Sequence, residues 1–63
     1  MKIKVQIDGG WPITFVGTCV EGRIKQGNGE WYKTIIILGK PLFGATIEKW
    51  AFCEPVCKWR IGT

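Results

Sequence analysis

The chain has 63 residues, with nine Lys and Arg, five Asp and Glu and no His, so its formal net charge is +4. A globular chain of this size buries only about 60% of the surface that its unfolded form exposes, which leaves no core to spare for a deep pocket. We therefore expect one small domain over residues 1–63 whose function lies on its surface or at a subunit interface, and most enzyme classes are excluded.

The composition is that of a folded, β-rich chain, with 46% hydrophobic and 22% charged residues. Nine Gly, three Pro and four Trp, together with many Ile and Val, favour short strands and tight turns. The longest apolar run, residues 35–38, is far shorter than a membrane span, and the N-terminal residues alternate instead of forming a signal sequence. We expect a cytoplasmic protein without membrane contact.

Two strands are predicted in the first half of the chain. Residues 2–7 alternate between polar and apolar side chains, which indicates a strand with one buried face, and a turn follows at residues 8–10. Residues 13–26 are again β-prone, but Gly17 and Gly22 interrupt the pattern. We expect a long second strand that bends or bulges to close a barrel.

The second half of the chain begins with the strongest local signal, an Asn-Gly pair at residues 28–29 between two extended runs, which predicts a β-hairpin. A loop is predicted at residues 39–44, and residues 47–51 have one helical turn as an alternative to a strand. The predicted third, fourth and fifth strands are residues 30–38, 45–52 and 58–61. Five short strands predict an all-β domain, either a small barrel or a rolled sheet.

Catalytic groups are scarce in this sequence. His, the commonest general base, is absent, and no Gly-rich phosphate loop precedes a helix. No spacing forces two carboxylates together among Asp8, Glu21, Glu30, Glu48 and Glu54. We predict that the chain is not an enzyme on its own and needs no cofactor; a site shared between subunits is the alternative.

Three cysteines raise the question of a metal site. The spacing of Cys53 and Cys57 suits a zinc knuckle, but Cys19 is the only other thiol and no His supplies a fourth ligand. An odd number of cysteines also disfavours a disulfide framework. We expect reduced structural thiols and no metal; a metal shared across subunits and a Cys53–Cys57 disulfide are the alternatives.

Cations and aromatic residues alternate on the predicted hairpin. A two-residue turn places Lys25 opposite Tyr32, whereas a three-residue turn places Lys25 opposite Trp31 and Arg23 opposite Lys33. Either register gives Lys25 an aromatic neighbour. Such a surface can stack a base and hold its phosphate, although cross-strand packing alone also explains the pattern. The candidate nucleic-acid-binding residues are Arg23, Lys25, Trp31, Tyr32 and Lys33.

Two further pairs of cations support a polyanion as the ligand. Lys2 and Lys4 share one face of the first strand, and Lys58 and Arg60 share one face of the last. The net positive charge of the chain is the electrostatic footprint expected of a nucleic-acid-binding domain.

The third strand has apolar side chains on both faces. Ile35 and Ile37 point to one side and Ile36 to the other, so a partner is expected to cover the face that the core does not use. Trp11 and Phe43 lie in predicted loops, where they either close the end of a barrel or contact a subunit. We predict a homo-oligomer whose possible interface residues are Ile35, Ile36, Ile37, Trp11 and Phe43.

Residues 17–25, 27–32 and 35–41 together resemble the first half of small OB-type barrels such as phage and plasmid single-stranded DNA-binding proteins. The resemblance implies that the matching hairpin contacts the nucleic acid through the five candidate residues named above. The chain is short for an OB-fold and lacks its usual helix between strands three and four. An SH3-like barrel fits the length better, so we expect an SH3-like or abbreviated OB-like domain.

These observations predict a non-enzymatic protein that binds single-stranded DNA or RNA with low sequence specificity. The alternative is a small interaction or inhibitory protein, of the viral or plasmid accessory type, that docks on a larger protein through a Trp/Ile surface. Cations and exposed aromatic rings on one face would favour nucleic acid. A contiguous apolar patch without cations would favour a protein partner.

Overall fold

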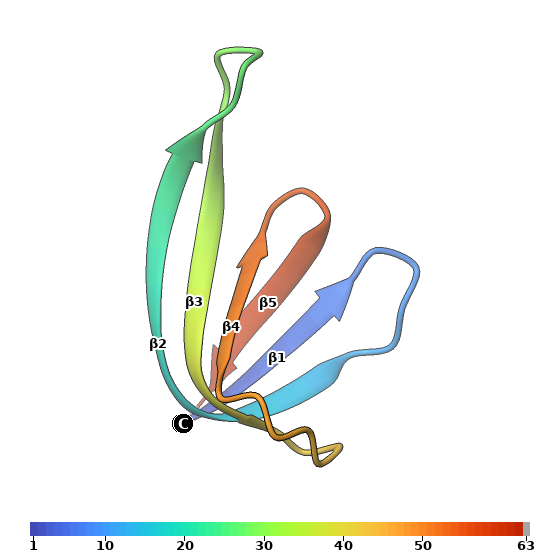
Figure 1. The fold of residues 1–63 in the computed structure, drawn as a ribbon. Coiled ribbons are helices and arrows are strands. Elements are labelled where there is room, and N and C mark those ends of the chain that lie inside the picture. Colours follow the sequence, from blue (N-terminus) through green and yellow to red (C-terminus); the bar gives the residue numbers. More distant parts are fainter. Residues whose placement is uncertain (63) are drawn as a thin grey trace.

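The computed structural model describes residues 1–62, which form five antiparallel strands in one sheet (Figure 1). The strand order is β4-β3-β2-β1-β5, and the edge strands β4 and β5 are not hydrogen-bonded to each other. The predicted all-β, five-stranded class is confirmed, in the form of a rolled, open sheet. The strands are β1 (Lys2–Ile7), β2 (Ile13–Lys25), β3 (Trp31–Pro41), β4 (Lys49–Cys53) and β5 (Cys57–Gly62). Within residues 1–62 there is no helix that could span a membrane.

The largest differences from the predicted strands lie between β3 and β4. β3 continues to Pro41, through residues predicted as a loop, because Gly39 and Pro41 pair with β2. Proline has no N–H to donate, and it is tolerated here at the end of the strand. The fourth strand begins only at Lys49, and no helical turn forms over residues 47–51.

The hairpin of β2 and β3 bends where Gly17 lies opposite Gly39. A β-carbon on Gly17 would collide with the carbonyl oxygen of Leu38, and one on Gly39 would collide with the carbonyl oxygen of Val16. The backbones therefore approach too closely for any side chain, and both strands curve sharply toward the base of the hairpin (Figure 1). The predicted bend is confirmed. The bulge offered as its alternative is wrong, because the pairing continues unbroken to Lys25.

The concave side of the sheet carries the core. Phe15 lies at its centre, with ring centroids 5.2 Å from Trp50 and 5.6 Å from Phe52. The members of the buried core cluster come from β1, β2, β3 and β5 and are Ile3, Val5, Phe15, Ile35, Ile37 and Cys57. Trp59 is half-buried against this cluster.

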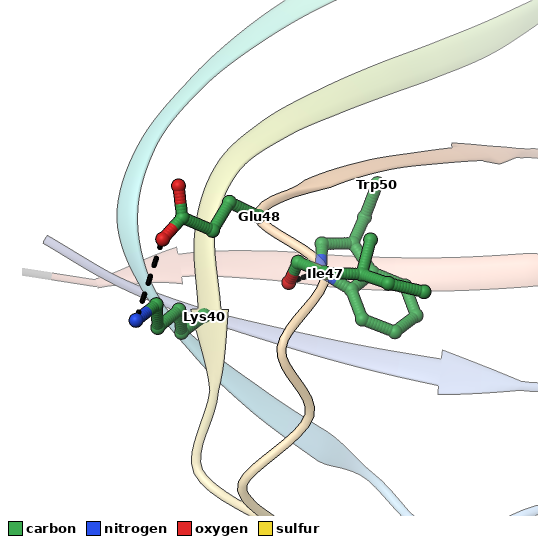
Figure 2. Close-up of polar contacts among 4 residues, drawn as sticks. All are labelled: Lys40, Ile47, Glu48 and Trp50. Carbon is green, nitrogen blue, oxygen red and sulfur yellow. Dashed lines mark hydrogen bonds and ion pairs between the residues drawn. The ribbon is translucent and has the colours of Figure 1, made fainter.

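The chain between β3 and β4 is tied back to the end of β3. The Gly39 N–H donates a hydrogen bond to the Glu48 carbonyl at 2.8 Å, and the Lys40 Nζ lies 3.3 Å from the Glu48 Oε1. The indole N–H of Trp50 donates to the Ile47 carbonyl at 3.0 Å (Figure 2). These contacts fix the start of β4 and hold the Trp50 ring over the core.

The molecule is elongated, with principal extents of 37 × 24 × 22 Å. The tip of the β2–β3 hairpin projects beyond the loop between β4 and β5 (Figure 1). The accessible surface is 4756 Å², whereas about 4,100 Å² is expected for a compact monomer of this mass. The projecting hairpin therefore has both of its faces available to partners.

Candidate nucleic-acid interface

The hairpin turn has three residues in its loop. The Gly29 N–H donates to the Gln26 carbonyl, and the Gln26 N–H donates to the Glu30 carbonyl, both at 2.9 Å. Gly29 has φ +84°, a left-handed conformation that glycine adopts at little cost and that closes this type of loop. Of the two registers left open by the sequence, the structure has the one with Lys25 opposite Trp31 and Arg23 opposite Lys33.

Four of the five predicted binding residues share one face of the hairpin tip. Side chains alternate without interruption from buried Phe15 to Lys25, and cross-strand partners lie on the same side, so these four are on the concave side beyond the core. All four are exposed, and Trp31 has 62% of its surface accessible. We call this surface the cationic hairpin face, and its members are Arg23, Lys25, Trp31 and Lys33.

The cationic hairpin face has an excess of positive charge. Arg23 lies directly opposite Lys33, an arrangement that is unfavourable in a sheet because like charges repel. Glu21 shares a shallow hollow of about 330 Å³ with these two cations, but no ion pair joins them. Within residues 1–62 the only ion pair is between Lys40 and Glu48. An anion that bound here would relieve the repulsion.

Tyr32, the fifth candidate, lies on the opposite, convex face, across from Ile24. Its hydroxyl donates a hydrogen bond to the Glu30 Oε2 at 3.0 Å and accepts one from the Asn28 Nδ2 at 3.1 Å. The ring is half-buried. Tyr32 thus holds the hairpin loop in shape and is not part of the cationic hairpin face.

A strip of exposed apolar side chains covers the convex face of the same hairpin. Val20, opposite Ile36, is 68% exposed, and the other members are each more than 40% exposed. We call it the convex apolar strip; it consists of Val16, Val20, Ile24, Ile36 and Leu38. Ile35 and Ile37, also predicted as interface residues, are fully buried in the core and cannot contribute to this surface.

The two predicted interface residues outside the strands lie in separate loops. Trp11, between β1 and β2, is 89% exposed. Phe43, between β3 and β4, is largely exposed, with its ring edge-on to Trp50 at a centroid distance of 6.3 Å. Neither loop belongs to the hairpin that carries the convex apolar strip.

The pairing of β1 with β5 brings together the cations at the two ends of the chain. Lys4 lies directly opposite Arg60, and Gln6 lies opposite Lys58. Buried Ile3 and Val5 flank Lys4 in β1, so this cluster is on the convex face. The sequence shows that cations alternate with apolar residues in each of these two strands. It has no local signal that the first strand pairs with the last.

The three cysteines are free thiols. Cys57 is buried in the core, Cys19 is half-buried, and the Cys53 thiol donates to the Glu54 carbonyl at 3.0 Å. No three Cys, Asp or Glu side chains of residues 1–62 come together as a metal site. Cys57 and Cys19 thus pack in and against the core.

The residues with a geometry suited to a ligand are therefore the cations and Trp31 on one side of the hairpin and the apolar side chains on the other. No protein-family model, curated protein or solved structure matches this chain, and the case for a function rests on that geometry.

Proposed function

We propose that the protein binds single-stranded DNA or RNA through the cationic hairpin face, with low sequence specificity and without catalysis. The observation that carries this proposal is the exposed indole of Trp31 directly opposite Lys25, with Arg23 and Lys33 next along the same face. The resemblance of the hairpin sequence to small single-stranded DNA-binding barrels points to these four residues and also to Tyr32, which lies on the other face.

Each group on this face has a role in that binding. The ammonium and guanidinium groups neutralise successive phosphates, and the indole stacks on a base. Stacking requires a base that is free of its duplex neighbours, which favours a single strand. Because every base has a π-face, stacking also tolerates any sequence.

Binding of a short oligonucleotide tests this proposal. With about three phosphates neutralised, log K for a strand of about four nucleotides should fall with log[salt] at a slope of roughly −2. Trp31→Ala should weaken binding by about 1–3 kcal/mol at any salt concentration, because it removes the stacking surface. Lys25→Gln should make the slope shallower by about 0.7, because one phosphate contact is lost. Fluorescence anisotropy of a labelled oligonucleotide measures both quantities.

Two matched variants serve as controls. Phe43→Ala removes an exposed ring at the other end of the molecule, and Lys49→Gln removes a cation from β4. Phe43→Ala should leave the affinity unchanged, in contrast to Trp31→Ala. Lys49→Gln should leave the salt slope unchanged, in contrast to Lys25→Gln. Binding weaker than about 10⁻⁴ M at low salt would contradict the proposal and favour a protein partner.

A second candidate function, self-association, is favoured by the convex apolar strip. All five members of the strip are apolar, with Lys40 opposite Val16 and Lys49 opposite Leu38 at its base, and a patch of this kind can pair with its own copy about a twofold axis. The chain also exposes more surface than a compact monomer of its mass, and a second copy would cover part of it. We propose that the protein is a homodimer through this strip, which leaves the cationic hairpin face free on the opposite side.

The double variant Val20→Lys with Ile36→Lys should convert this dimer into a monomer, because four ammonium groups would face one another at a twofold interface. Sedimentation equilibrium at micromolar concentration should show the dimer for the wild-type chain and for the control Val56→Lys, an exposed valine in the β4–β5 loop. Circular dichroism should show the same strand content in all three. A wild-type monomer would contradict the dimer and leave the strip to a larger protein.

A further inference from the structure

The convex face of β1 and β5 carries four cations from the two ends of the chain. Lys4 lies directly opposite Arg60, and Lys58 is two residues before Arg60 on the same side. All of these side chains are exposed. We call this surface the β1–β5 cation cluster, and its members are Lys2, Lys4, Lys58 and Arg60.

The cluster lines a groove. It is lined by Lys4, Val5, Gln6, Pro12, Lys58, Trp59 and Arg60, and its volume is about 270 Å³. Trp11 does not line the groove, but it directly precedes Pro12 in the chain and is 89% exposed. The groove thus presents three exposed cations, as the cationic hairpin face does.

The arrangement of charge is unfavourable without a ligand. Lys4 and Arg60 repel each other across the strands, as Arg23 and Lys33 do on the hairpin. Asp8 lines an adjoining hollow with Lys58, but among residues 1–62 no carboxylate forms an ion pair with any member of the cluster. Two like-charged cross-strand pairs on one small sheet are both explained if each holds phosphates.

We infer that the β1–β5 cation cluster is a second phosphate-binding site, which takes the backbone of the same single strand that the cationic hairpin face binds. The identity of the ligand rests on the proposed function, whereas the site itself rests on its own geometry. The two sites lie on opposite sides of the sheet, so a long strand engages both and a short strand only one. Joining two such contacts on one strand raises the overall affinity without any new kind of contact.

Strand length and paired variants test this inference. For an oligothymidine of about 16 nucleotides, the salt slope of the wild-type chain should steepen from roughly −2 to about −4, because the three cations of the hairpin and the three that line the groove then contact phosphates. The double variant Lys4→Gln with Arg60→Gln should make that slope shallower by about 1.4, because two phosphate contacts are lost. It should leave binding of the short oligonucleotide by the hairpin unchanged. Between 1 M and 0.1 M salt, its affinity for the long strand should rise about 25-fold less than that of the wild type.

The matched control is Lys40→Gln with Lys49→Gln, which removes the same net charge from outside both sites. If the control makes the salt slope as shallow as the cluster variant does, the change in slope reflects net charge alone and the second site is overturned. The thermal midpoint of the cluster variant should not fall, because its substitutions relieve a repulsion on exposed side chains.

The hairpin double variant Lys25→Gln with Lys33→Gln separates this inference from the proposed function. If the hairpin variant makes the salt slope shallower and the cluster variant does not, the second site is overturned and the proposed function stands. If only the cluster variant makes the slope shallower, the second site is supported and the hairpin function is overturned. If neither variant changes binding, both are overturned.

Discussion

Replacing Gly39 with alanine is expected to destabilise the fold by about 3 kcal/mol or more. The added methyl group would collide with the carbonyl oxygen of Val16 and with the Cα of Gly17, and both are backbone atoms that cannot rotate away. The two strands would have to separate at the corner of the sheet, where β2 leaves its pairing with β1. A chain of this size has a folding free energy of only about 5 kcal/mol, so most of its stability would be lost.

Urea unfolding followed by circular dichroism measures this effect, and Gly27→Ala is the matched control. No atom lies within 4 Å of a β-carbon placed on Gly27, and its φ is not positive. Alanine there should leave the stability unchanged or raise it by up to about 1 kcal/mol, because it restricts the unfolded chain. Equal midpoints for Gly39→Ala and the wild type would show that the strands do not approach closely at this corner.

Phe15→Ala is expected to cost about 3–5 kcal/mol, because it empties the centre of the core. The Phe15 ring is fully buried and packs against both Trp50 and Phe52 of β4, so its loss also removes the contacts of these two rings with β2. Tryptophan fluorescence during urea unfolding reports the transition. The variant should show little or no folded baseline at room temperature.

Phe43→Ala provides the comparison for a ring of the same kind outside the core. Phe43 is 63% exposed and has one edge-on contact with Trp50, so its removal should cost no more than about 1.5 kcal/mol. If Phe15→Ala and Phe43→Ala lowered the free energy of unfolding by similar amounts, the centre of the core would not be at Phe15.

Much of the fold could be predicted because its signals are local. The alternation over residues 2–7 and the Asn-Gly turn at residues 28–29 depend only on neighbouring residues, and both elements are present in the structure. The end of β3 could not be predicted, because Gly39 and Pro41 are typical of a loop and become strand only through pairing with β2. The close approach of Gly17 and Gly39 is likewise a non-local contact between residues 22 positions apart.

The order of residues on the hairpin predicts which side chains the candidate site can contain, but not which of them share a face. A sequence shows that Lys25 has an aromatic neighbour, but the hydrogen bonds of the turn decide that this neighbour is Trp31 and that Tyr32 belongs to the other face. The alternation over residues 35–38 separates two faces, yet only the curvature of the sheet determines which of them is buried. The sequence therefore also offers Ile35 and Ile37 as possible interface residues, whereas both are fully buried.

The open seam between β4 and β5 has a consequence for solubility. The outer edges of these two strands have backbone N–H and C=O groups that no strand within residues 1–62 pairs, and such edges are templates for aggregation. Charged side chains, lysine above all, are a common protection against edge-to-edge growth, and Lys49 on β4 and Lys58 and Arg60 on β5 are placed to provide it. We therefore expect an open sheet of this kind to depend on its positive charge to stay dispersed.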